Sequence, residues 1–158
     1  GQGAFDPAIK NLYKTDLIDN LKDWIAKGNP FLGICLGLQL LFEYSEEGDK
    51  EGLGFIKGGI KKIPQIQNQK IPHIGWCKLI IEKESKLLSR EYSDYWVYFD
   101  HSYFAVPSDK ELITASVEYG PTFLTAVVEY ENLLACQFHP EKSGEKGEII
   151  LHRWLQNI

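Results

Sequence analysis

The 158-residue sequence has no methionine, only three cysteines and no long uninterrupted apolar segment. Cys35, Cys77 and Cys136 are odd in number and widely spaced, so neither a disulfide framework nor a CxxC zinc site is expected. A reducing, cytoplasmic location is the usual setting for such isolated thiols. No apolar run approaches the ~18–20 residues that cross a bilayer. We therefore expect no association with a membrane.

Positive charge is also scarce. The net charge is −5, and the only basic cluster, residues 57–62, holds three lysines. A nucleic-acid partner is therefore not expected. The four histidines lack the spacing of metal ligands, and no phosphate-binding glycine loop precedes a predicted helix. We expect neither a metal nor an organic cofactor.

The start of the chain bears on the missing methionine. The sequence begins Gly1-Gln2-Gly3, whereas a natural full-length chain would begin with methionine. We therefore expect that a further N-terminal segment belongs to the protein. With 44% hydrophobic and 25% charged residues, the composition favours one globular domain over residues 1–158.

Hydrophobic periodicity divides the chain into two halves. In the first, residues 16–26 have helical periodicity, residues 31–34 form an apolar run typical of a strand buried on both faces, and residues 36–44 again favour a helix. The second half is β-rich and ends in a helix that Ser143 could cap. The predicted strands are residues 55–63 (a strand or a hairpin), 95–99, 112–116, 122–129 and 133–138, the last two joined as a hairpin. This order indicates a mixed α/β domain.

The segment Gly33-Ile34-Cys35-Leu36-Gly37 has the spacing of a nucleophile elbow, with sulfur in place of oxygen. A nucleophile between a buried strand and a helix lies in a strained turn, and the two glycines let neighbouring backbone pass closely. The N-terminus of the following helix is expected to lower the pKa of the Cys35 thiol. The N–H group of Leu36 is placed to stabilise an oxyanion. The alternative is that Cys35 is a small buried residue without a chemical role.

A cysteine nucleophile needs a base, and His139 is the strongest of the four histidines. It ends an apolar strand and is therefore expected to face a cleft, while Pro140 fixes the turn that follows. Glu141 could bond the far ring nitrogen and set the tautomer, the third role in a catalytic triad. The alternative for His139 alone is an ordinary loop histidine.

Several of these segments carry a resemblance to a known family. Residues 30–41, which contain the elbow, and Gln137-Phe138-His139-Pro140-Glu141 resemble class I (triad) glutamine amidotransferases. Residues 72–76 and 98–103, with Gly1-Gln2-Gly3-Ala4-Phe5, narrow the resemblance to the glutaminase subunits of imidazole glycerol phosphate synthase, in histidine biosynthesis. The resemblance runs over the whole chain.

The resemblance implies a fold and a reaction. The fold is the three-layer α/β (flavodoxin-like) fold of class I glutamine amidotransferases, with a central mixed, largely parallel sheet and an N-terminal βα portion missing here. Cys35, His139 and Glu141 match the catalytic triad that hydrolyses glutamine to glutamate and ammonia. The ammonia would pass to a (β/α)8 cyclase subunit in a heterodimer, which makes imidazole glycerol phosphate and an aminoimidazole carboxamide ribotide.

The same resemblance assigns roles to further residues. An oxyanion loop would consist of Gly1, Gln2 and Gly3, acting together with Leu36. The positions that match contacts to the glutamine substrate are Gln39, Glu47, Ser102 and Tyr103; a carboxylate such as that of Glu47 suits the α-ammonium group. The positions that match the interface with the cyclase are Trp76, Tyr98 and Lys142.

Two departures from the family pattern leave alternatives open. Cys77 stands where the family typically has asparagine, and Asp100 stands where it typically has an apolar residue. They raise the alternative of a paralogous glutaminase that supplies ammonia to a sugar amidotransferase in surface-polysaccharide synthesis. A third alternative, a catalytically silent scaffold subunit, would require a broken triad, and all three triad positions are intact in this sequence. A cysteine peptidase would not need Gln39 or Glu47, which suit a free amino acid.

Overall fold

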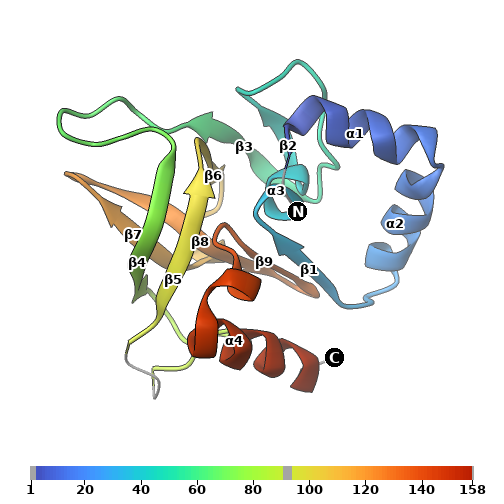
Figure 1. The fold of residues 1–158 in the computed structure, drawn as a ribbon. Coiled ribbons are helices and arrows are strands. Elements are labelled where there is room, and N and C mark those ends of the chain that lie inside the picture. The colour runs from blue at the N-terminus through green and yellow to red at the C-terminus, as the bar shows by residue number, and fades with distance from the viewer. Residues whose placement is uncertain (1–2, 91–93, 158) are drawn as a thin grey trace.

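The computed structural model describes residues 3–90 and 94–157. Figure 1 shows helices α1 and α2 near the N-terminus, two sheets, and helix α4 at the C-terminus. The helices are α1 (Phe5–Lys14), α2 (Leu17–Ala26), α3 (Leu36–Leu40) and α4 (Gly144–Gln156), with short 3-10 turns η1 (Lys110–Leu112) and η2 (Pro140–Lys142). The strands are β1 (Phe31–Ile34), β2 (Phe42–Ser45), β3 (Ile56–Lys62), β4 (His73–Ile81), β5 (Trp96–His101), β6 (Tyr103–Pro107), β7 (Ile113–Tyr119), β8 (Thr122–Tyr130) and β9 (Leu133–Cys136).

The larger sheet has the strand order β1-β9-β8-β7-β4-β5, and the smaller one the order β2-β3-β6. Strands β1 and β9 are parallel neighbours, with Ile34 opposite Cys136. Because both strands run the same way, their carboxyl ends meet at one edge of the sheet. The residues that follow them, Cys35 and the segment 137–139, are therefore brought together.

Two hydrophobic clusters lie on the two faces of the larger sheet. Strand β9 shows the division, because Leu134 and Cys136 join the cluster that includes Ile150 of α4, whereas Leu133 and Ala135 join the cluster that includes Ile25 of α2. Successive side chains of a strand point to opposite faces, so a strand covered on both sides must be apolar throughout. This is why residues 133–136 are all buried.

The α/β class is confirmed, but several details of the prediction are wrong. The described strand pairs are mostly antiparallel, and the parallel pairs are β1–β9 and β2–β3. The helix predicted over residues 36–44 ends at Leu40, since Phe42 instead pairs with Ile56 in the smaller sheet. Of the two alternatives for residues 55–63, a strand or a hairpin, the strand is confirmed: Ile56–Lys62 form one strand between β2 and β6. Helix α1 and strands β4 and β6 were not predicted.

Ser143 precedes helix α4 as expected, but its side chain does not cap the helix. Its hydroxyl donates to the backbone oxygen of His139 at 2.6 Å and accepts from the backbone N–H of Tyr98 at 2.9 Å. The side chain therefore joins two other elements, β5 and the turn after β9. Within residues 3–90 and 94–157, no helix has the length and apolar character needed to span a membrane.

Candidate active site

Cys35 occupies the strained turn that its sequence pattern predicts. It lies between β1 and α3 with φ 51° and ψ −105°, a conformation that costs on the order of 1–3 kcal/mol for a residue other than glycine. Its backbone N–H donates to the oxygen of Cys136 at 2.8 Å, which ties the turn to the end of β9. A Cβ added at Gly33 would lie 2.9 Å from the backbone of Gly37, so the turn requires glycine there. At Gly37 itself an added Cβ would meet nothing within 4 Å.

The electrostatics of the Cys35 thiol differ from the prediction. The side chain is 7% exposed, and this burial raises the pKa of the Cys35 thiol above its ordinary value. Helix α3 has five residues, too few to offset the burial with a large dipole. The Nε2 atom of Gln137 donates to the sulfur at 3.5 Å. Cys35 thus rests as a protonated thiol and depends on a base to become a nucleophile.

His139 and Glu141 form a pair beside Cys35. The Nδ1 atom of His139 lies 2.7 Å from a carboxylate oxygen of Glu141. Partial burial opposes ionisation of Glu141, but the hydrogen bonds from His139 and from the backbone outweigh it and lower the pKa of this carboxyl. An ionised carboxylate only accepts hydrogen bonds, so Nδ1 carries the proton and Nε2 of the neutral ring is the basic nitrogen.

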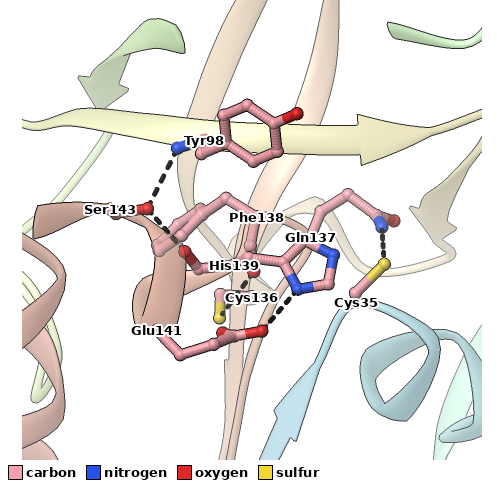
Figure 2. Close-up of polar contacts among 8 residues, drawn as sticks. All are labelled: Cys35, Tyr98, Cys136, Gln137, Phe138, His139, Glu141 and Ser143. Atoms are coloured by element: carbon pink, nitrogen blue, oxygen red, sulfur yellow. Dashed lines mark hydrogen bonds and ion pairs between the residues drawn. The ribbon is translucent and has the colours of Figure 1, made fainter. Parts of the chain in front are cut away.

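The Nε2 atom of His139 is buried and has no hydrogen-bond partner within the described part of the chain. Figure 2 shows the imidazole between the Glu141 carboxylate and the Cys35 thiol, with its free nitrogen on the Cys35 side. The histidine is 1% exposed, so it lies under the surface and not in an open cleft as the sequence suggested. A buried nitrogen with an unsatisfied lone pair is suited to take a proton from the thiol.

The backbone around His139 is tied to strand β5. The N–H of His139 donates to the backbone oxygen of Tyr98 at 2.9 Å, and Ser143 bridges the N–H of Tyr98 and the oxygen of His139 (Figure 2). These three hydrogen bonds fix the turn that carries the histidine. His139 is therefore positioned by a strand whose residues alternate between buried and partly exposed.

A cavity of about 200 Å³ opens onto Cys35. It brings together all four residues predicted to bind glutamine, which come from three separate places in the sequence. The lining residues are Gly3, Cys35, Leu36, Gln39, Glu47, Pro72, Asp100, His101, Ser102 and Tyr103. A larger cavity of about 410 Å³, lined in part by Phe55, Lys57 and Tyr130, has no cysteine or histidine among its described lining residues.

Gln39 and Glu47 line this cavity, and both side chains already make hydrogen bonds to other residues of the protein. Gln39 is buried, and its Nε2 donates to the oxygen of Tyr103 at 3.1 Å and to Oε1 of Gln137 at 3.2 Å. Glu47 accepts from the N–H of Phe5 at 2.9 Å, which holds its carboxylate at the start of α1. Gln39 is therefore a buried residue of the cavity wall.

The predicted oxyanion loop is described only in part, because Gly1 and Gln2 lie outside the described residues. Gly3 and Leu36 both line the cavity. Gly3 has φ 134°, a conformation that favours glycine. The N–H of Leu36 lies close enough to Cys35 to act against the rise in the pKa of its thiol, although burial dominates.

Three residues at the site were not predicted as part of it. Asp100 was noted only as a departure, yet it lines the cavity and its charge adds to the rise in the pKa of Cys35 that burial causes. His101 and Gln137 also contact cavity residues. The signal in the sequence was their place within the matched segments 98–103 and 137–141. Between residues 3 and 90 and between 94 and 157, no three His, Cys, Asp or Glu side chains are grouped to hold a metal ion.

The three residues predicted to face a partner form one surface cluster. The rings of Trp76 and Tyr98 meet edge to face with their centroids 6.1 Å apart, and the Nζ atom of Lys142 lies 5.9 Å from the centre of the Tyr98 ring. Trp76 is 50% exposed. Exposed aromatic rings backed by a cation are typical of protein interfaces.

Known proteins resemble this chain in sequence and in fold. The family model for glutamine amidotransferase class-I matches residues 7–157. Imidazole glycerol phosphate synthase subunits HisH from Prochlorococcus marinus subsp. pastoris and from Prochlorococcus marinus strain MIT 9312 are 60% and 61% identical over the whole chain, which spans 77% of each. A crystal structure of a glutamine amidotransferase superposes with a TM-score of 0.67 at 17% identity, covering 93% of this chain and 70% of that one, which shows the fold alone. The chain belongs to the class-I glutamine amidotransferase family.

Proposed function

We propose that this chain is the glutaminase subunit of an imidazole glycerol phosphate synthase, in which it hydrolyses glutamine and passes the ammonia to a cyclase subunit. The observation that carries the reaction is the meeting of Cys35 with the His139–Glu141 pair at the ends of two adjacent parallel strands. The identity of 60% over the full chain to HisH subunits supports the pathway.

The geometry supports a two-stage hydrolysis. The Nε2 atom of His139 takes the thiol proton of Cys35, and the thiolate attacks the side-chain carbonyl carbon of glutamine. The N–H of Leu36, together with the loop that contains Gly3, stabilises the oxyanion that forms. His139 returns its proton to the nitrogen, which leaves as ammonia, and a γ-glutamyl thioester remains. Water then attacks the thioester with His139 as base, releasing glutamate and the thiol.

The charge of the cavity favours a free amino acid. Glu47 and Asp100 both line it, and the lining residues include no lysine or arginine. A carboxylate pair attracts the α-ammonium group of glutamine. Ser102 and Tyr103, at the junction of β5 and β6, are positioned to contact the substrate backbone.

The surface cluster of Trp76, Tyr98 and Lys142 supports a cyclase partner in a heterodimer. Tyr98 is bonded through its backbone to His139, so a partner on this face would cover the strand that positions the base. Docking there would also give ammonia a route that avoids the solvent.

The proposal can be tested with glutamate release by the chain mixed with a cyclase subunit. We expect release that Cys35→Ala abolishes while partner binding persists, and labelling of Cys35 by a chloroketone analogue of glutamine. Release that survives Cys35→Ala, or labelling at Cys77 or Cys136 instead, would refute the assignment of the nucleophile. Rescue of a histidine auxotroph would support the pathway; failure of the complete gene to rescue would favour the sugar-amidating paralogue.

A further inference from the structure

A line of buried polar side chains runs from the surface to the cavity without involving His139. His73 and His101 are opposite each other on β4 and β5 and are 7% and 6% exposed. The Nδ1 atom of His73 lies 2.9 Å from Nε2 of His101, and Nε2 of His73 lies 3.2 Å from the sulfur of Cys77. The Nδ1 atom of His101 lies 2.9 Å from the backbone oxygen of Tyr103. Gly75, between His73 and Cys77, has φ 134° and no side chain to separate them.

One end of this line determines the direction of every hydrogen bond in it. The oxygen of Tyr103 can only accept, so Nδ1 of His101 carries a proton. Burial lowers the pKa of His101 to about 3, so the ring is neutral and its Nε2 accepts. His73 must then donate from Nδ1. Because burial also lowers the pKa of His73, its ring is neutral as well, and its Nε2 accepts from the Cys77 thiol.

The Cys77 thiol can be the donor to Nε2 of His73. Burial raises the pKa of the Cys77 thiol, which keeps its proton available for donation. The order of donation is therefore Cys77 to His73, His73 to His101, and His101 to the oxygen of Tyr103. No other order satisfies the carbonyl oxygen with neutral rings.

The line continues into the active site. The oxygen of Tyr103 also accepts from Nε2 of Gln39, whose amide group donates in turn to Oε1 of Gln137. Gln137 then donates to the sulfur of Cys35. The orientation of both amides follows from these contacts, since their NH2 groups face protein acceptors. Gln39 consequently offers the substrate its carbonyl oxygen, an acceptor for an ammonium or amide N–H.

The two ends of the line open onto different cavities. His101 lines the glutamine cavity. His73 and Cys77 line a surface cavity of about 510 Å³ that also includes Trp76 and Trp96. Trp76 belongs to the cluster proposed to meet the cyclase. The line thus connects the partner-facing surface with the cavity that holds the nucleophile.

We propose that His73 and His101 are positioning residues for the glutaminase reaction, forming a neutral one-directional hydrogen-bond relay from Cys77 that fixes the Tyr103 carbonyl and, through it, the amides of Gln39 and Gln137 beside Cys35. The relay rests on the proposed function in one respect: the amides of Gln39 and Gln137 surround the site proposed to bind glutamine. Its existence and its direction can be measured without any activity.

The direct test is the tautomer of each histidine in the whole chain, measured by long-range ¹⁵N–¹H correlation with ¹⁵N-labelled histidine. We expect both His73 and His101 to be neutral with the proton on Nδ1 at neutral pH, whereas a free imidazole favours the proton on Nε2. A proton on Nε2 of either ring, or an imidazolium at either position, overturns the relay. His152, on the surface helix α4, serves as the internal reference.

The functional test compares Cys77→Ala with Cys77→Ser in the complex with the cyclase. Alanine removes the first donor and leaves the buried Nε2 of His73 without its partner, while the Tyr103 oxygen still sets both tautomers, so the line loses its anchor at the surface end. We expect KM for glutamine to rise about 3- to 10-fold with kcat changed much less. Serine keeps a donor to Nε2 of His73 and should restore KM.

The two variants separate the relay from a purely structural role. If alanine leaves KM unchanged, or if serine is as impaired as alanine, the relay is wrong. If the unmodified complex releases no glutamate while both rings carry the proton on Nδ1, the proposed function fails and the relay stands.

Discussion

Gly33→Ala tests whether the elbow that holds Cys35 depends on close backbone contact. A Cβ at position 33 would lie 2.9 Å from the backbone carbon and oxygen of Gly37 and from the nitrogen of Leu38, whereas ordinary contact begins at 3.4 Å. All three atoms are backbone, so the turn itself must move by about 0.5 Å. Such overpacking costs about 1–3 kcal/mol. At roughly 2–4 °C per kcal/mol for a chain of this size, Tm should fall by about 2–12 °C.

The activity of Gly33→Ala should fall as well, because the displaced turn carries both Cys35 and the N–H of Leu36. We expect kcat for glutamate release to drop about 10-fold or more. Gly37→Ala is the matched control, since its added Cβ meets nothing within 4 Å and helix α3 gains about 0.5–1 kcal/mol from alanine. Urea and thermal unfolding, together with a glutamate assay, measure both. Equal losses in the two variants, or a larger loss at Gly37, would refute the reasoning.

Glu141→Ala removes the acceptor of the His139 Nδ1 proton, and kcat should fall about 10²-fold or more in the glutamate assay; a change under about twofold would count against the triad. Because burial raises the pKa of Cys35, its alkylation by iodoacetamide should accelerate steadily from about pH 7 to about pH 9, and a plateau at lower pH would contradict this. Asp100→Asn removes a charge that adds to this rise, so its profile should shift to lower pH; an upward shift would be contrary evidence. Trp76→Ala should weaken cyclase binding in calorimetry by about 2 kcal/mol with Tm nearly unchanged, and unaltered binding would remove Trp76 from the interface.

The parts of the fold that were predictable have a local cause. Residues 31–34 and 133–136 are apolar throughout because both faces of their strands are covered, and that pattern is visible in the sequence. The helix over 36–44 was overestimated because Phe42 leaves the helix to pair with Ile56 on a separate segment. Strand β4 went unpredicted because half of its residues face outward and Gly75 interrupts it. Pairing with distant segments decides such cases, and a single sequence does not show it.

The residues of the candidate site were likewise predictable only where their roles depend on a local sequence motif. Cys35 and His139 could be found because each belongs to a short motif whose chemistry is local. Gln137 and His101 could not be given roles, since these roles consist of contacts to residues far away in the chain. The direction of the shift in the pKa of Cys35 was also wrong, because it depends on how deeply the fold buries the thiol and not on the short helix that follows it.

The backbone and the side chain of Tyr98 have separate roles, because the backbone alone holds His139 to strand β5. The backbone N–H and oxygen of Tyr98 hold the turn that carries His139; every substitution keeps the oxygen, and only proline removes the N–H. Its ring contacts Trp76 and Lys142 on the surface. Affinity for a partner and placement of His139 can therefore change independently, because the ring at position 98 can be replaced while the backbone that holds the histidine stays the same.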